Sequence, residues 1–307
     1  MDHAWDDTAL DAAIAELEEH RISPARTILA EARTQPETRS LRVEVLAGRL
    51  VGLGGQVLSL AMDSVDPELS LLAGAVAIAE AQVIADGATD SNAARVAHAY
   101  LRRALGPLNQ AAELVDTDPV PHDLLQTVTS ATNRAECDKA WERAVKRGPT
   151  LFSAHRARVE ILDPVKALAF ARATARSAGS GDPRIALVVL AHFRVHAGLE
   201  AAFRASGKAA DRRAMWDYFG GAVRDEVAAL SQRFLAAARP HPRTVEAHNL
   251  FAAAFTRMYE YSLAEPHLAA VAGRPSGWAW SFVGGAKAYD RAVRRHVRNV
   301  PADRPRP

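Results

Sequence analysis

The stretch Pro149-Thr-Leu-Phe-Ser-Ala-His155 recurs later in the chain as Pro242-Arg-Thr-Val-Glu-Ala-His248. A second proline follows each copy after a similar interval, because Pro183 lies 34 residues after Pro149 and Pro275 lies 33 residues after Pro242. A period near 34 residues is typical of arrays of helix pairs, in which each pair buries its apolar face only by stacking on a neighbour. The repeated stretch therefore predicts an architecture, and it leaves the chemistry open.

The composition indicates helices and no strands. Of the 307 residues, 49% are hydrophobic and 6% are aromatic. Alanine, the best helix former, dominates long runs such as residues 75–84, and alternating β-branched runs bounded by turn residues are nearly absent. We therefore predict an all-α protein: a right-handed superhelix (α-solenoid) of antiparallel helix pairs. We expect it to form one continuous domain over residues 1–300, followed by a disordered tail at 301–307.

Proline, glycine and aspartate divide the chain into the expected helices. The clearest repeats cover residues 119–199 and 242–296, and we interpret 200–240 as an insertion or a degenerate repeat. In the latter region, 213–238 is typical of one long helix or of two. Further predictions concern single elements. We expect a long helix from Asp66-Pro67 to about Ala85, a helix over 93–105 that ends at Gly106-Pro107, and a last helix over 278–297.

The repeat resembles the tetratricopeptide family, whose unit has small residues where two helices cross and a proline after the second helix. In the unit after Pro149, the matching positions are Ala171, Ala178 and Pro183. In the unit after Pro242 they are Phe251, Ala252, Phe255, Ala264 and Leu268, and before Pro149 they are Trp141 and Ala144. The sequence departs from the family where His155 and His248 replace its usual Trp, where Arg158 replaces Leu and where Ala175 replaces Phe.

The resemblance also implies where a ligand would bind. In the family a concave groove is lined by first-helix residues, and the matching positions here are Arg156 and Glu160 in one unit and Asn249 in the other, with Arg257 one turn further along. An Arg and an Asn in such a groove could hold the carboxylate or backbone of a peptide. The alternative is that these polar groups are simply solvated.

Aromatic residues gather near the C-terminus, in the stretch Trp278-Ala-Trp280-Ser-Phe282. On a helix Trp278 and Phe282 share a face, whereas Trp280 points well away from it. Trp280 is therefore a candidate exposed anchor for a partner, unless a neighbouring helix or the tail covers it.

Two further residue groups could carry chemistry. His192 and His196 lie four residues apart on a predicted helix, so that both imidazoles could face one metal ion. A third ligand is not evident, and the alternative is that one histidine packs between helices while the other is solvated. Cys137 is the single cysteine and falls on the Ala position of a repeat helix, which predicts a small buried packing residue and excludes an intrachain disulfide.

The charges are unevenly distributed, although the formal net charge is only +2. Residues 1–20 hold seven acidic side chains and no Lys or Arg, whereas the last residues are basic. The basic side chains near the end are Lys287, Arg291, Arg294, Arg295, Arg298, Arg304 and Arg306. Either these are solvated helix faces and a tail, or the acidic and basic ends pair between two copies of the chain or recruit charged partners.

These observations favour a protein- or peptide-binding scaffold or regulatory accessory protein. We expect no cofactor, because no phosphate loop, nucleophile elbow or dinucleotide motif is present. We also expect no membrane segment, a cytoplasmic location and no nucleic-acid partner, since the chain lacks a signal peptide, a long uncharged apolar run and a strong basic bias. The alternative is an enzyme on a helical scaffold, with a pocket near His192, His196 and the 200–240 region.

Overall fold

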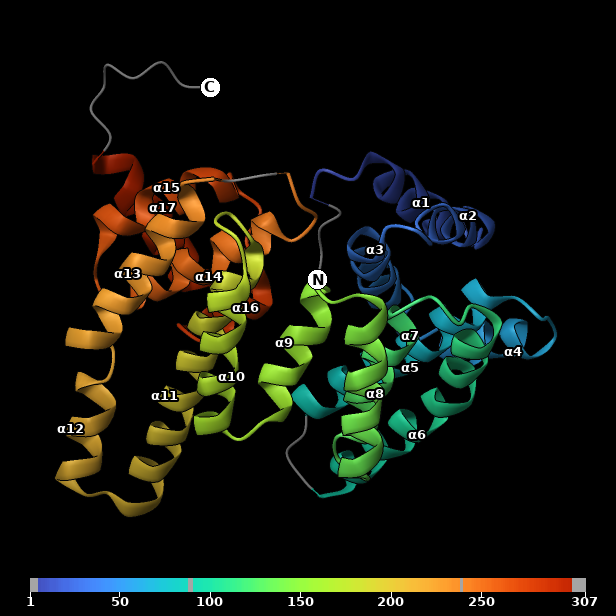
Figure 1. The fold of residues 1–307 in the computed structure, drawn as a ribbon, viewed down its shortest axis with the longest axis horizontal. Coiled ribbons are helices and arrows are strands. Elements are labelled where there is room, and N and C mark those ends of the chain that lie inside the picture. The colour runs from blue at the N-terminus through green and yellow to red at the C-terminus, as the bar shows by residue number, and fades with distance from the viewer. Residues whose placement is uncertain (1–4, 88–90, 238–239, 300–307) are drawn as a thin grey trace. The chain divides into compact units, whose positions relative to one another are not determined.

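The structure of the chain is a computed structural model, and it describes residues 5–87, 91–237 and 240–299 (Figure 1). These residues form helices joined by short turns, and no strand occurs among them. The all-α prediction is thereby confirmed. By their internal contacts the residues divide into two compact units, Met1–Ile161 and Leu162–Pro307. The predicted tail at 301–307 lies outside the described residues.

Unit 1 contains nine helices among its described residues, and its centre is α5, which is buried along most of its length. The long α6 lies along α5, and α3, α4 and α7 also pack on it. The helices are α1 (Thr8–Glu18), α2 (Ser23–Glu31), α3 (Pro36–Arg49), α4 (Gly54–Met62), α5 (Pro67–Asp86), α6 (Ser91–Leu114), α7 (Val120–Thr129), α8 (Arg134–Arg147) and α9 (Phe152–Ile161).

A buried arginine links four segments of unit 1. The Arg39 side chain on α3 is fully buried, and its guanidinium donates to Asp118 at 2.7 Å and to Glu68 at 2.8 Å. It also donates to the backbone carbonyl of Leu29. Asp118 in turn accepts from the backbone N–H of Val120, the first residue of α7. Because one unpaired buried charge is costly, this cluster ties α2, α3, α5 and α7 into one register.

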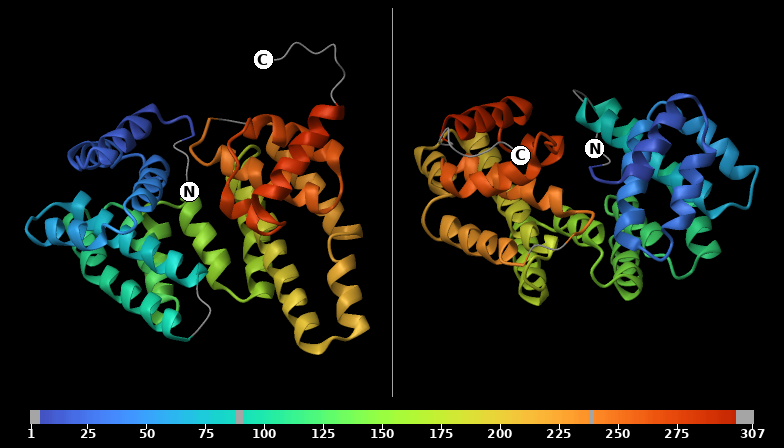
Figure 2. Two further views of the ribbon diagram at one scale, coloured as in Figure 1. Left: turned by 180° about the vertical axis from the view of Figure 1, so that it is seen from behind. Right: turned by 90° about the horizontal axis from the view of Figure 1, so that it is seen from above.

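Unit 2 is built around the start of α11 and around α14, both of which are almost completely buried. The helix α14 contacts α15 and α16, while α11 and α12 form a hairpin whose helices run side by side in each view (Figures 1 and 2). The elements are α10 (Pro164–Ser177), the 3-10 turn η1 (Pro183–Ala186), α11 (Leu187–Ser206), α12 (Ala209–Asp217), α13 (Gly221–Leu235), α14 (Thr244–Arg257), α15 (Tyr261–Val271), α16 (Gly277–Ser281) and α17 (Gly285–Asn299).

The two copies of the repeated stretch have the same local packing. His155 near the start of α9 meets the Trp141 ring of α8 edge-on, with ring centroids 5.1 Å apart. His248 near the start of α14 meets the Phe234 ring of α13 in the same edge-on manner at 5.0 Å. In both cases the aromatic residue precedes the histidine by the same number of residues, so the sequence repeat is also a repeat of side-chain packing.

Two predicted helix ends are wrong. Gly106-Pro107 does not end a helix, because α6 continues through Pro107 to Leu114. Packing on α5 explains this, since the fully buried Leu108 fills the space left by Gly74 of α5 and holds the second half of α6 in place. The last helix is not continuous over 278–297 but divides into α16 and α17, because Gly284 and Gly285 have φ values of +107° and +66°. Such values are readily adopted only by glycine, and they interrupt the helix.

The region 200–240 resolves into the end of α11, then α12 and α13. Of the two possibilities left open for 213–238, the structure has two helices, separated at Tyr218–Gly220. Two helical segments, Pro67–Asp86 and Pro183–Ser206, are long and apolar enough to cross a membrane by length and composition alone. Within their most apolar windows, 61% and 56% of the residues are buried against the rest of the protein, as expected of core helices.

Candidate functional site

Of the predicted groove residues in unit 1, Arg156 is engaged within the protein. It lies on α9 and donates to Glu44 of α3 at 3.0 Å, which leaves its side chain 16% exposed. Glu160, one turn further along α9, is exposed. The structure therefore places these two residues on one helix, but it uses Arg156 to join α9 to α3.

Asn249 and Trp280, two of the three remaining predicted contacts, are buried, so neither side chain is exposed to a ligand. Asn249 is fully buried on α14, and its Oδ1 accepts from the Trp280 indole N–H at 2.8 Å and from the backbone N–H of Ser276 at 2.9 Å. Its amide donates to the carbonyls of Val245 and Arg274. The hydrogen bond to Asn249 holds the buried Trp280 inside unit 2.

His192 forms a closed polar chain rather than half of a metal site. Because a carboxylate only accepts, His192 Nε2 donates to Glu226 of α13 at 3.1 Å, and its Nδ1 accepts from the Tyr218 hydroxyl at 2.8 Å. Arg172 of α10 completes the chain with two hydrogen bonds to Glu226, at 2.7 and 2.6 Å. Burial lowers the pKa of His192, although Glu226 acts in the opposite direction, and burial raises the pKa of Tyr218 to about 12. A phenol of raised pKa is a poor nucleophile, which suits a structural role.

His196 points to a different partner. Its Nε2 accepts from the Arg257 guanidinium at 3.0 Å, and the backbone of Met215 bonds to the ring as well. Burial lowers the pKa of His196, and the charge of Arg257 lowers it further, so the ring stays a neutral acceptor at pH 7. The two histidines therefore do not converge on one metal ion. Among the described residues, no group of three or more His, Cys, Asp and Glu side chains is placed to hold one.

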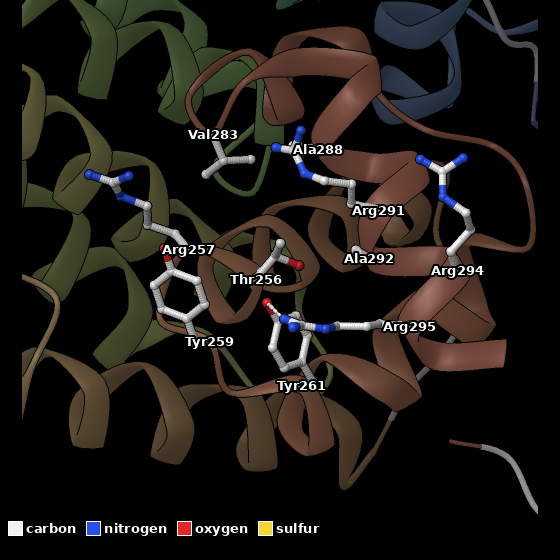
Figure 3. A pocket seen from close by; sticks show the side chains of 10 residues that line it. All are labelled: Thr256, Arg257, Tyr259, Tyr261, Val283, Ala288, Arg291, Ala292, Arg294 and Arg295. Carbon is white, nitrogen blue, oxygen red and sulfur yellow. Dashed lines mark hydrogen bonds between the residues drawn. The ribbon is translucent and has the colours of Figure 1, made fainter. Parts of the chain in front are cut away.

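Arg257 leads to the candidate functional site, a cavity of about 460 Å³ in unit 2 (Figure 3). In the figure, Arg257 from the end of α14 lies on the other side of the cavity from three arginines of α17, and its guanidinium points away from them. We call this cavity the arginine pocket. Its described lining residues are Thr256, Arg257, Tyr259, Tyr261, Val283, Ala288, Arg291, Ala292, Arg294 and Arg295.

Helical spacing brings the three arginines of α17 together. Arg291, Arg294 and Arg295 are three and four residues apart, and side chains at that spacing lie on one side of a helix. Ala288 and Ala292 of α17 are small and buried, so the backbone of α17 can lie close to the rest of the pocket. The arginines then project around the cavity.

The pocket concentrates positive charge, and the Glu200 carboxylate, which is not a lining residue, offsets part of the charge of Arg257. The pocket contains four arginines, and no Asp or Glu is found among its described lining residues. The nearby Glu260 is already bonded to Arg224 at 2.5 Å. Arg295 stacks on the Tyr261 ring at 4.5 Å and donates to the Tyr261 hydroxyl, whereas Arg291 and Arg294 have no ion-pair or hydrogen-bond partner among the described side chains. Guanidinium forks with free donors bind carboxylate and phosphate groups.

Tyr259 has an unusual backbone at the edge of the pocket. It follows the end of α14 with φ of +62°, the left-handed region that usually holds glycine. Its N–H donates to the carbonyl of Thr256, and the next N–H, of Glu260, donates to the carbonyl of Phe255, which is the Schellman pattern. A bulky residue in this position is strained, and such strain is commonly found at functional sites.

Sequence reasoning missed most of this pocket. It identified Arg257 as a groove residue, and it noted Arg291, Arg294 and Arg295 only as part of a basic end. The useful signal was their spacing on one helix face, together with the nearby Tyr259 and Tyr261. Cys137, in contrast, was predicted correctly as a buried packing residue: it is fully buried, and burial raises the pKa of its thiol.

Comparison with known proteins gives no match. No protein-family model matches the sequence, and neither a curated protein nor a solved structure is significantly similar to it.

Proposed function

We propose that this chain is a binding protein that recognises an acidic segment of a partner protein through the arginine pocket. The observation that carries the proposal is that four arginines line one cavity, with no carboxylate among the described lining residues. Like charges at this spacing on a helix destabilise it, so an anionic ligand that relieves the repulsion would bind favourably. The groups that line the pocket bind anions well, whereas they include no nucleophile paired with a base.

The proposal includes the arrangement of the helices. We infer that the helix pairs stack as in tetratricopeptide proteins, in a right-handed superhelix located in the cytoplasm. The support is the recurrence of the sequence stretch together with the matching contacts of His155 with Trp141 and of His248 with Phe234. The enzyme alternative has no observation in its favour, since the ring nitrogens of His192 are already bonded within the protein.

The test is the binding of a fluorescent hexaglutamate peptide, with hexaglutamine as the neutral comparison. We expect only hexaglutamate to bind, with an affinity that falls as salt increases. The variant Arg291→Ala/Arg294→Ala should bind at least about 10-fold more weakly, because each lost charge-assisted hydrogen bond contributes about 1.5–3 kcal/mol.

The matched control is Arg212→Ala/Arg213→Ala, which removes two exposed arginines of α12 outside the pocket. It removes the same net charge and should leave binding within about twofold, because long-range charge effects are largely screened. Equal losses in the two variants, or no binding of hexaglutamate to the unchanged protein, would contradict the proposal. A change of molecular mass with salt would indicate that the basic end instead pairs with the acidic N-terminal region of a second copy.

A further inference from the structure

The charge of the arginine pocket exceeds what one carboxylate can neutralise. Arg257 is held by His196 and Arg295 by Tyr261, so two of the four guanidinium groups are fixed in place by neutral partners. Arg291 and Arg294 add two more cations that no described side chain neutralises. A neutral imidazole and a phenol position a guanidinium without reducing its charge, and the site is therefore both preorganised and strongly cationic.

A phosphate monoester fits this site better than a carboxylate does. It carries a charge of about −1.5 to −2 at pH 7 and three strong acceptor oxygens, whereas a carboxylate carries one charge and two oxygens. Three acceptor oxygens can receive hydrogen bonds from more than one guanidinium fork, and in Figure 3 the side chains of Arg291 and Arg295 extend from α17 toward the cavity. The tyrosine hydroxyls of the lining can also donate to phosphate.

The remaining lining points to a peptide around the phosphate. The cavity of about 460 Å³ lies within the range of pockets that hold whole small molecules, so it has room for more than one phosphate group. Its lining includes the apolar Val283, Ala288 and Ala292, and the Tyr259 side chain is 76% exposed. An exposed tyrosine beside a charged cavity is a typical contact for peptide side chains.

We propose, building on the proposed function, that the arginine pocket is a phosphate-recognition site for a phosphorylated protein segment. The phosphate would lie beside the α17 arginines, and the residues that flank the phosphorylated side chain would pack on Tyr259 and Val283. Phosphorylation of the partner would then control binding, because the unmodified serine or threonine offers no charge to the site.

The experiment compares three fluorescent peptides of the form acetyl-Ala-Ala-Xaa-Ala-Ala, in which Xaa is phosphoserine, glutamate or serine. At pH 7.5 we expect the phosphoserine peptide to bind at least about 10-fold more tightly than the glutamate peptide, because it forms additional charge-assisted hydrogen bonds. The serine peptide should not bind. The advantage of phosphoserine should decrease toward pH 5.5, because its second ionisation has a pKa of about 6.

Variants test whether the preference for phosphoserine arises in the arginine pocket. In Arg291→Ala/Arg294→Ala the preference for phosphoserine should disappear, whereas Arg212→Ala/Arg213→Ala should keep it. Tyr259→Ala should weaken the binding of the phosphoserine peptide. It should not change the binding of free inorganic phosphate, which has no flanking residues to contact Tyr259. Circular dichroism of each variant verifies that the helices are intact.

The outcomes separate this inference from the proposed function. Equal affinities for the phosphoserine and glutamate peptides would overturn the phosphate assignment and leave recognition of acidic segments standing. If inorganic phosphate competes as well as the phosphopeptide, or if vesicles containing phosphatidylinositol phosphate bind and the peptide does not, the peptide assignment is wrong. Failure of hexaglutamate and of all three peptides would overturn both proposals.

Discussion

At the scale of single residues, Asn249 is the clearest example of a polar group whose role the sequence could not reveal. The tetratricopeptide resemblance placed it in a groove, yet all of its hydrogen-bonding groups are used inside unit 2. Oδ1 accepts from Trp280 and from the backbone of Ser276, while the amide donates to two carbonyls. Sequence position alone cannot distinguish such an internal anchor from a ligand contact, because both require a polar residue at the same place on a helix.

The role of Asn249 predicts a large loss of stability on substitution. Asn249→Ala leaves the indole N–H of Trp280 and the backbone N–H of Ser276 buried without acceptors, at about 1–3 kcal/mol for each buried unsatisfied group. We expect the free energy of unfolding in urea to fall by roughly 2–4 kcal/mol. The exposed Gln232→Ala on α13 serves as the control and should change it by less than about 0.5 kcal/mol. If Asn249→Ala proves as mild as the control, the buried network has been assigned wrongly.

Tyr259 presents the opposite case, a residue that we expect to reduce stability. Its positive φ in the Schellman turn after α14 suits glycine, and holding a side chain there costs about 1–2 kcal/mol. Tyr259→Gly should therefore raise the free energy of unfolding by roughly 1 kcal/mol. The same variant should bind the phosphoserine peptide more weakly, because the exposed tyrosine ring is lost. A variant that is less stable than the unchanged protein would show that the Tyr259 ring, with its edge-on contact to Tyr261, contributes more than the strain costs.

At the scale of elements, the sequence predicted helices best where local signals and packing agree. Asp66-Pro67 starts α5 as expected, since Asp66 accepts from the N–H groups of Glu68 and Leu69. Asp163-Pro164 starts α10 in the same way, with Asp163 accepting from Lys166. These caps are local, and a residue and its near neighbours suffice to recognise them.

The wrong helix ends arose where distant packing decides. The local sequence around Gly106-Pro107 does not show that Leu108 fills the space over Gly74. On local signals alone, the proline therefore predicts the end of a helix. The arginine pocket could not be predicted from the sequence for the same reason, because distant packing forms it. It joins the end of α14 to α17, and these two segments line one cavity only because α16 and the glycine turn place α17 there.

The glycine turn between α16 and α17 gives a prediction at this scale. Gly284 has φ of +107°, which L-residues rarely adopt, so Gly284→Ala should lower the free energy of unfolding by about 1–3 kcal/mol. Because the turn positions α17, peptide binding in the arginine pocket should weaken as well. Gly198→Ala is the matched control. Gly198 lies inside α11 with open space around it, so this change should stabilise the helix by about 0.5–1 kcal/mol. Equal effects of the two substitutions would contradict the proposed importance of the turn.

At the scale of the whole molecule, buried histidines in both units should set the response to acid. In unit 2, Ser231 Oγ lies 2.7 Å from His267 Nε2, and His267 Nδ1 lies 2.9 Å from His248 Nδ1. Burial lowers the pKa of both histidines, and the proximity of the two rings adds to the effect on His267. In unit 1, burial and the charges of Arg147 and Arg143 lower the pKa of His122 to about 4.

The sign of the pH dependence follows from these shifts. A histidine of ordinary pKa near 6.5 takes up a proton in the unfolded chain before it does so in the folded protein, so acid favours unfolding. The free energy of unfolding therefore keeps its full value above pH 6.5, where these histidines are neutral in both states. It decreases progressively as the pH falls toward 4. For His122 the loss is on the order of 3 kcal/mol, since its pKa falls from 6.5 to about 4 and each pKa unit corresponds to about 1.4 kcal/mol.

His122 allows this prediction to be tested on one residue, because both of its ring nitrogens are buried without a hydrogen-bond partner among the described residues. His122→Leu therefore removes the titrating group without breaking a hydrogen bond. We expect its free energy of unfolding at pH 7.5 to be equal or higher, and its decline between pH 6.5 and 4.5 to be shallower than in the unchanged protein. The exposed His20→Asn provides the control, because Asn tolerates the positive φ of +60° at that position. Urea titrations across the pH range measure both variants. If His122→Leu and His20→Asn follow the same curve as the unchanged protein, protonation of His122 does not limit the acid stability of unit 1.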